Sequence, residues 1–255
     1  AYLSAQADFS RQAATLVEDG AFWREVILLA VGRLVYLSGD TDKPLALVGE
    51  LCPRGASDGE TAWRKAWLAG DVLAELGLNR VREGNLGRDL LERVRGRLGD
   101  LLVGGYLEPV ARAAAGRTLA ELGDPRPGVG LRDDGLPDID WCEVSPGPFL
   151  MGSADEDEMA YGDEKPQHTH NIEQPYAIGR YPVTNAQYAA FVQAGGYGER
   201  RYWTEAGWSW RESNNVTEPE GYGEPFSLSN HPVVGVSWYE AAAFCRWLTE
   251  QLRGR

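Results

Sequence analysis

The spacing of apolar residues predicts that the first part of the chain is helical. Trp63, Trp67 and Leu68, then Val72 and Leu76, recur at three- and four-residue intervals, which places them along one stripe of a helix. We predict helices at these places: from Phe22 to the stop at Ser38-Gly39-Asp40, Lys43–Leu51, Trp63–Leu76 with Gly77 as its C-cap, Asp89–Val103, and Pro109–Leu122 before Gly123. Such short helices with Gly- and Asp-rich turns and no heptads are typical of stacked helical pairs, although we find no clean internal repeat.

The pattern changes after residue 123. Residues 124–137 combine Pro, Gly and acidic residues, which is typical of a linker. Beyond it, Ile139–Val144 alternates like a strand, and Pro146-Gly147 predicts a turn into a hairpin partner at Phe149–Gly152. Tyr176–Val183 is a further predicted strand. We therefore predict an α+β protein with a helical region at 1–123, a linker at 124–137 and a mixed domain at 138–255.

Two helices in the second part carry start signals. Thr184 or Asn185 precedes a predicted helix that runs to Gln193 and ends at two glycines. Ser237 precedes a helix that extends to Gln251, and Glu240 follows it at the spacing of a capping box.

Composition limits the class of protein. The chain has 255 residues, 43% of them apolar, which allows one large domain or two ordinary ones. No apolar run is long enough to span a membrane, and the net charge of −13 opposes non-specific binding to nucleic acid or an anionic membrane. Cys52, Cys142 and Cys245 are odd in number and widely spaced, which favours a reducing compartment. We expect a cytoplasmic protein without nucleic-acid or membrane partners.

An ordered series of motifs in the second part is more specific than any of these signals. The series consists of Phe149-Leu150-Met151-Gly152-Ser153, Asp163-Glu164-Lys165-Pro166-Gln167-His168, Gly179-Arg180-Tyr181-Pro182-Val183-Thr184-Asn185-Ala186-Gln187-Tyr188 and His231-Pro232-Val233-Val234-Gly235-Val236-Ser237-Trp238-Tyr239-Glu240-Ala241. It resembles the first half of the formylglycine-generating sulfatase-modifying family, which implies a C-type-lectin-like fold. The resemblance also implies that the catalytic cysteines of that family would lie beyond Arg255, so we expect a truncated domain that is completed by a C-terminal segment, a second copy or a partner chain.

A weaker resemblance concerns the end of the helical part. Residues 111–126 resemble a segment that precedes sulfatase-modifying-like domains in bacterial NACHT-type (STAND) signalling NTPases. No Gly-x-x-x-x-Gly-Lys-[Ser/Thr] phosphate-binding loop is present in the sequence. The C-type-lectin-like fold is also shared with the variable proteins that retroelements diversify.

Metal-binding candidates are weak. Residues 155–158, with Asp163 and Glu164, could offer carboxylate oxygens to a hard cation such as calcium, but they lack the spacing of an EF-hand. His168 and His170 would share one face of a strand, with His231 or Glu164 as a third ligand. Because solvated acidic loops and ordinary surface histidines are commoner, we predict no metal and no cofactor.

The best candidates for ligand binding are aromatic. Tyr202, Trp203, Trp208 and Trp210 follow one another in an Arg- and Gly-containing stretch, and Tyr222 lies in the Gly-rich segment before His231. Packing in the core is the competing explanation for Trp203 and Trp208. Cys245 is predicted to be a core residue on the apolar face of the last helix, and no residue is predicted to be catalytic.

Three functions are compatible with these observations. We favour a non-catalytic module that recognises a protein or peptide ligand at the sensor or variable-protein end of a bacterial signalling or defence protein. The second hypothesis is an oxidase that converts a cysteine or serine of a sulfatase to formylglycine, which needs the paired cysteines of a missing half. The third is a structural or assembly role for the helical arm through an exposed Trp63 or Trp67.

Overall fold

The computed structural model describes residues 2–17 and 22–253, and the regular elements of its first part are all helices. The elements up to residue 122 are η1 (Leu3–Ala5), α1 (Phe9–Leu16), α2 (Phe22–Ser38), α3 (Asp42–Leu51), α4 (Glu60–Leu76), α5 (Leu78–Glu83), α6 (Asn85–Val103) and α7 (Pro109–Leu122). The predicted helices are all present, and α1 and α5 are additional. The predicted helical region starts at Ala1 and the predicted mixed domain ends at Arg255. Ala1, Gly254 and Arg255 lie outside the described residues.

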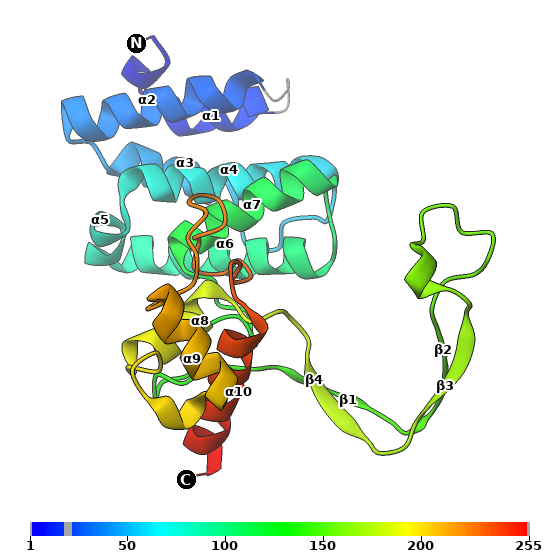
Figure 1. The fold of residues 1–255 in the computed structure, drawn as a ribbon. Coiled ribbons are helices and arrows are strands. Elements are labelled where there is room, and N and C mark those ends of the chain that lie inside the picture. The colour runs from blue at the N-terminus through cyan, green and yellow to red at the C-terminus, as the bar shows by residue number, and fades with distance from the viewer. Residues whose placement is uncertain (1, 18–21, 254–255) are drawn as a thin grey trace.

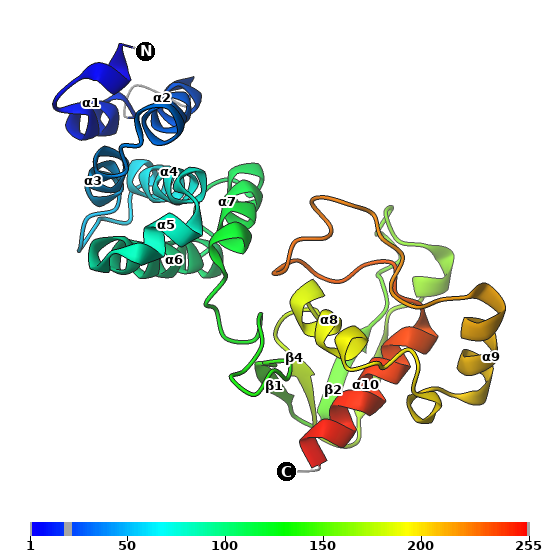
Figure 2. The ribbon, with the colours of Figure 1, turned by 90° about the vertical axis from the view of Figure 1, so that its left-hand side faces the viewer.

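Helix α4 lies at the centre of the helical part. It packs against α2, α3, α5, α6 and α7, and Figures 1 and 2 show the helices stacked in successive layers. Trp63, Leu68, Val72 and Leu76 are at most 2% exposed, so the predicted stripe is the buried face of this helix. A Cβ atom at Gly70 would lie 2.8 Å from Thr118 Cγ2, because α4 and α7 approach closely here. Trp63 is thus part of the core, and Trp67 is half-buried, which removes the exposed aromatic surface that the assembly hypothesis requires.

A polar network links three of these helices inside the array. Arg24 Nε donates to Asp71 Oδ2 at 3.0 Å, and Thr118 Oγ1 donates to Asp71 Oδ1 at 2.7 Å. Trp67 Nε1 donates to the same hydroxyl group at 3.0 Å. Burial raises the pKa of Asp71, and the Arg24 guanidinium opposes this rise. The network therefore connects α2, α4 and α7 through side chains that are satisfied within the array.

The second part consists of strands and short helices with a separate core. Its elements are β1 (Trp141–Val144), β2 (Gly147–Met151), η3 (Gly162–Glu164), β3 (His168–Ile172), β4 (Tyr176–Gly179), α8 (Asn185–Gln193), η4 (Arg200–Tyr202), α9 (Glu205–Asn214) and α10 (Trp238–Arg253). The structure is therefore α+β, as predicted. The buried residues here form one aromatic-rich cluster: Leu136, Tyr188, Phe191, Tyr197, Tyr202, Trp203, Ala243, Phe244, Trp247 and Leu248.

The four strands form a ribbon rather than a broad sheet. β1 pairs antiparallel with β4, and β2 pairs antiparallel with β3, so Figure 1 shows two consecutive two-stranded ladders extending away from the helices. The predicted hairpin between the first two strands is wrong, because each pairs with a strand that follows much later in the sequence. Large apolar side chains are exposed along the ribbon: Trp141 53%, Phe149 42%, Leu150 67%, Met151 48%, Tyr176 50% and Ile178 55%.

Helix α10 also carries apolar residues on more than one face. Phe244, Trp247 and Leu248 are buried against the aromatic core, whereas Trp238 is 71% exposed. Cys245 is exposed, so its predicted place in the core is wrong. It follows Phe244 by one residue, and this step of about 100° turns its side chain away from the buried face.

The two parts meet at α7. Asn230 donates to the carbonyl oxygen of Gly116 at 3.1 Å and to Asp124 Oδ2 at 2.9 Å. Arg126 forms an ion pair with the same carboxylate at 2.7 Å. Burial alone would raise the pKa of Asp124, but the hydrogen bonds from Arg126 and Asn230 outweigh it and hold the pKa below its ordinary value. Asp124 is therefore an ionised anchor between the helical part and the segment before His231.

Candidate functional site

Helix α8 is held in place by a capping box that reaches into the linker. Thr184 Oγ1 accepts from Gln187 N at 3.3 Å, and Gln187 Oε1 accepts from Thr184 N at 3.0 Å, which completes the box. Gln187 Nε2 also donates to the carbonyl oxygens of Gly128 and Asp138. Thr184 Oγ1 donates to the carbonyl oxygen of Val129 at 2.7 Å. Both side chains are buried, so they fix the start of α8 against residues 128–138.

The same helix start fixes the long segment that precedes α10. Asn185 Nδ2 donates to the carbonyl oxygens of Phe226 at 2.6 Å and Leu228 at 2.9 Å. The backbone N–H of Asn185 donates to His231 O at 2.9 Å, and Val233 N donates to Val183 O at 2.9 Å. One face of α8 and this segment therefore lie opposite each other at a fixed separation.

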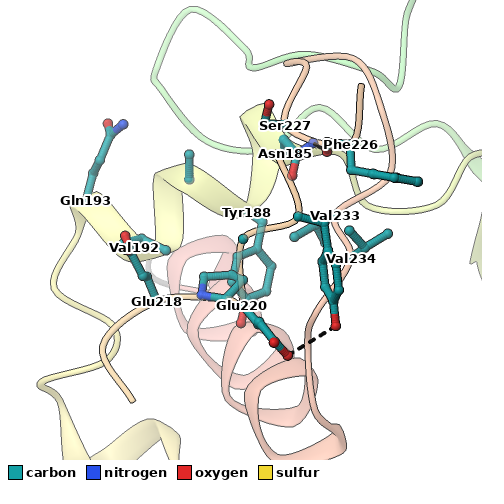
Figure 3. Close-up of a pocket in the computed structure, with 14 residues that line it drawn as sticks. Asn185, Tyr188, Val192, Gln193, Glu218, Glu220, Phe226, Ser227, Val233 and Val234 are labelled. Atoms are coloured by element: carbon teal, nitrogen blue, oxygen red, sulfur yellow. Dashed lines mark hydrogen bonds between the residues drawn. The ribbon is translucent and has the colours of Figure 1, made fainter. Parts of the chain in front are cut away.

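A cavity of about 370 Å³ lies between them (Figure 3). Tyr188, Val192, Val233 and other apolar groups form much of its surface, and Glu218 and Glu220 supply its carboxylates. The complete lining is Asn185, Tyr188, Ala189, Val192, Gln193, Glu218, Pro219, Glu220, Gly221, Tyr222, Phe226, Ser227, Val233 and Val234, with no Lys, Arg or His. The cavity therefore combines apolar walls with uncompensated negative charge.

A row of buried polar groups runs from the cavity wall to the start of α10. Tyr188 Oη and Tyr197 Oη lie 3.2 Å apart, and Tyr197 Oη donates to Glu240 Oε1 at 2.6 Å. Glu240 Oε2 accepts from Ser237 N at 2.7 Å, and Ser237 Oγ accepts from Glu240 N at 3.4 Å, so the predicted capping box is confirmed.

The two phenols of this row have raised pKa values. Burial raises the pKa of both Tyr188 and Tyr197, and the hydrogen bond to Glu240 raises the pKa of Tyr197 further. Both phenols therefore stay protonated at neutral pH. Because each oxygen of the Glu240 carboxylate already accepts a hydrogen bond, the row stabilises the wall of the cavity rather than supplying a base.

The predicted binding residues do not gather in one place. Tyr202 and Trp203 are 4% and 5% exposed and belong to the aromatic core, where Trp203 Nε1 donates to Gly196 O at 3.0 Å. Trp208 and Trp210 are partly buried on α9 and pack against the same core. Tyr222 lines the cavity and donates to Glu220 Oε2 at 3.1 Å.

Most residues of the cavity were not predicted from the sequence. Neither the face of α8 nor the pair of glutamates was selected. The tight spacing of Glu218 and Glu220 beside Tyr222 and Phe226, in a Gly-rich segment, is the only local signal that could have pointed to it.

The candidate metal ligands are placed on the ribbon and its tip. His168 and His170 lie on β3, where His170 contacts the ring of Phe149 at 5.7 Å between centroids. Lys165 Nζ donates to the carbonyl oxygens of Asp155 at 2.8 Å and Asp157 at 2.9 Å, so Lys165 links two backbone positions of the acidic loop. Within the part of the chain that the structure describes, no three His, Cys, Asp or Glu residues are grouped as metal ligands. No described helix is both long enough and apolar enough to cross a bilayer.

Comparison with known proteins identifies the second part of the chain. Residues 139–253 match the Sulfatase-modifying factor enzyme 1-like domain. The hercynine oxygenase of Mycolicibacterium thermoresistibile is 34% identical over 116 residues, which are 41% of this chain and 26% of the relative. The formylglycine-generating enzyme of Thermomonospora curvata is 35% identical over 131 residues, which are 42% of this chain and 43% of the relative. The serine/threonine-protein kinase pkn1 of Chlamydia caviae is 30% identical over 115 residues, 43% of this chain and 17% of the relative.

These matches correct the functional prediction. The sulfatase-modifying resemblance is confirmed for residues 139–253, and the relatives are named as enzymes. The prediction of a non-catalytic recognition module is therefore wrong, and the second part of the chain is related to enzymes. The matches give no support to the resemblance of residues 111–126 to NACHT-type proteins or to a relationship with retroelement variable proteins. The chain spans about a quarter of the hercynine oxygenase and less than half of the formylglycine-generating enzyme.

Proposed function

We propose that residues 139–253 are part of a formylglycine-generating type of enzyme, which oxidises a cysteine or serine of a sulfatase. The observation that carries the proposal is the match of this whole region to the Sulfatase-modifying factor enzyme 1-like domain. The 35% identity to the Thermomonospora curvata enzyme over 131 residues supports it independently.

In this proposal the described residues bind and position, and they do not themselves oxidise the substrate. Cys142 lies on β1 and Cys245 on α10, and both are free thiols. The capping boxes of α8 and α10 and the buried Tyr188–Tyr197–Glu240 row supply a rigid frame. Such a frame is what a catalytic domain needs to hold its reacting groups in place.

The exposed ribbon supports the expectation that further protein completes this domain. A two-stranded ribbon is marginally stable alone in water, and apolar side chains on its surface favour burial against another layer. Leu150 and Ile178 are 67% and 55% exposed, and Trp238 on α10 is 71% exposed. We propose that additional residues of the same domain cover these side chains, which is consistent with the greater length of the relatives.

A second candidate is an oxygenase of the hercynine type. Three hercynine oxygenases, from Mycolicibacterium thermoresistibile, Mycobacterium tuberculosis and Mycolicibacterium smegmatis, are 34%, 32% and 30% identical over 116, 117 and 120 residues. These identities are close to the 35%, 32% and 29% of the three formylglycine-generating enzymes.

The test uses the natural gene product in full, with its intact mass recorded first. The protein is incubated aerobically with a cysteine-containing peptide from a sulfatase, and separately with hercynine and a thiol. Formation of an aldehyde on the peptide, detected by mass spectrometry and by capture with a hydroxylamine probe, supports the formylglycine-generating activity. Oxidation of hercynine alone would replace it with the second candidate. If the folded protein changes neither substrate, both proposals are refuted.

A further inference from the structure

The cavity between α8 and residues 218–234 has two glutamates and no cationic side chain in its lining. We propose that it binds a small organic cation, with an ammonium or guanidinium group at Glu218 and Glu220 and an apolar body against Tyr188, Val192 and Val233. The lining residues named here all belong to the described part of the chain, and the proposal does not depend on the proposed oxidation.

The charge argument begins with what surrounds the two glutamates. No ion pair is recorded for Glu218 or Glu220 among the residues that the structure describes, and the cavity lining contains no cationic side chain. Both glutamates are exposed at the rim of the cavity, whereas the poorly exposed carboxylates Asp71 and Asp124 are paired with Arg24 and Arg126. Two unpaired carboxylates at the rim of a cavity that has no cationic side chain attract a cation and repel an anion.

The geometry of the cavity favours an organic cation over a hard metal ion. Tyr222 Oη donates to Glu220 Oε2 at 3.1 Å, which orients that carboxylate, as the dashed line in Figure 3 shows. The rings of Tyr222 and Phe226, which both line the cavity, lie 6.5 Å apart between centroids, edge to face. Aromatic faces attract organic cations, whereas calcium requires six or more oxygen ligands, roughly, in one shell.

Tyr188 contributes a ring rather than a polar group. Its phenol oxygen lies 3.2 Å from Tyr197 Oη and is directed to the buried row, and the residue is only 3% exposed. Tyr188 therefore adds apolar ring surface to the α8 side of the cavity, beside Val192. A volume of about 370 Å³ is near the lower end of ligand cavities, so it suits a small molecule or one long side chain.

A second cavity shows why charge balance matters. The cavity of about 620 Å³ against Trp67 in the helical part contains Arg24, Arg64, Glu60 and Glu108. There Arg24 is paired with Asp71, Arg64 with Glu60 at 2.9 Å, and Glu108 accepts from the first N–H groups of α7. Its charges are satisfied within the protein, so it carries no preference for a charged ligand.

The test measures binding of 2-phenylethylammonium to the whole protein by calorimetry. The neutral 2-phenylethanol and the anionic 3-phenylpropionate serve as ligands of similar shape. We expect the ammonium compound to bind at least tenfold more tightly than the alcohol, the anion not to bind, and the affinity to fall as ionic strength rises. A short peptide with one arginine, compared with its citrulline form, tells whether the cation is free or part of a chain. Selective binding of either cation supports the site.

Two variants with the same change in charge localise the binding. Glu218→Gln/Glu220→Gln should weaken ammonium binding at least tenfold, whereas Glu156→Gln/Glu158→Gln, at the exposed tip of the ribbon, should leave it unchanged. Thermal unfolding of both variants checks that each is folded. Equal binding of the alcohol, equal loss in both variants, or displacement of the ammonium compound by calcium at equal concentration would overturn the proposal.

Discussion

Replacement of Gln187 by methionine should destabilise the second part of the chain strongly, although the two side chains are similar in size. Gln187 is 0% exposed, and its amide group forms hydrogen bonds with three backbone groups: Thr184 N, Gly128 O and Asp138 O. Methionine keeps the volume and removes these bonds. The variant thus separates the polar contribution from the cost of a cavity.

The magnitude follows from the burial of the three partners. Gly128 and Thr184 are buried, so two backbone groups would lose their partner where water does not reach, at about 1–3 kcal/mol each. Asp138 is only half-buried, and water can replace the lost bond to its carbonyl oxygen. We expect a total loss of about 3 kcal/mol, which is roughly a hundredfold in the opening equilibrium of α8.

The assay is hydrogen exchange read by mass spectrometry on peptides that cover α8 and residues 128–138. A local measurement is needed because the buried residues form two separate clusters and global unfolding need not be two-state. The matched control is Gln193→Met at the other end of α8, where the side chain is exposed and a change within about 0.5 kcal/mol is expected.

A second variant tests the direction of the hydrogen bonds. Gln187→Glu keeps the acceptor for Thr184 N and sets a carboxylate oxygen against the carbonyl oxygens of Gly128 and Asp138. Burial raises the pKa of such a carboxyl group in the folded state, so its destabilisation should lessen as the pH falls and the group gains a proton. If Gln187→Met lowers protection no more than Gln193→Met does, the buried amide does not hold α8 and the reasoning is refuted.

Three further predictions concern other buried groups. Asp124→Asn should weaken the loss of folding stability at acid pH. The folded pKa of Asp124 lies below its ordinary value of 3.8, so its contribution to stability is complete above 3.8 and is lost as the pH falls through the folded pKa. Unfolding curves at several pH values check this, and an unchanged pH dependence would contradict it. Tyr197→Phe should lower the free energy of unfolding by about 2 kcal/mol, because Glu240 loses a charge-assisted hydrogen bond in the core; a denaturant midpoint equal to that of the wild type would disprove this role. A maleimide reagent should modify the exposed Cys245 in the native protein. It should modify Cys52 only after unfolding, because this residue is 1% exposed and burial raises the pKa of its thiol. Equal rates of modification would contradict the burial of Cys52.

The parts of the fold that the sequence predicted well are those set by local signals. Thr184 and Ser237 each precede a residue at the third helical position whose side chain returns to the cap, and both helices begin where this pattern places them. The stripe on α4 is equally local. Such signals depend on neighbours within one or two helical turns, which the sequence displays directly.

Helix α9 was missed although it has a start signal. Thr204 is its N-cap and accepts from Gly207 N at 3.0 Å, and Glu205 follows in the first turn. Gly207 and Ser209 weaken the helical propensity of this segment, and Trp208 and Trp210 are two residues apart rather than three or four, so the aromatic residues appeared to belong to a loop. Packing of Trp208 and Trp210 against the aromatic core stabilises the helix instead.

Strand pairing and the cavity could not be predicted because both join distant segments. Pro146 and Gly147 favour a tight turn, yet β1 pairs with β4 and β2 with β3, in a register that the sequence of one strand does not encode. The cavity depends on hydrogen bonds from the side-chain amide and the backbone N–H of Asn185 to carbonyl oxygens of residues 226–231, and backbone acceptors carry no residue-type pattern.

The frame of the cavity and the exposed ribbon are independent parts of the second region. None of the residues that line the cavity belongs to β1–β4, and none of the four strands contributes a residue to the buried aromatic cluster. Covering the ribbon with further protein would therefore stabilise the strands without altering the groups at Glu218 and Glu220. If the proposed enzymatic activity requires a covered ribbon and the cation binds without it, the two functions can be separated in one protein. Loss of oxidation with intact cation binding would then locate the defect in the ribbon and its cover, whereas loss of both would locate it in the frame that α8 and α10 build.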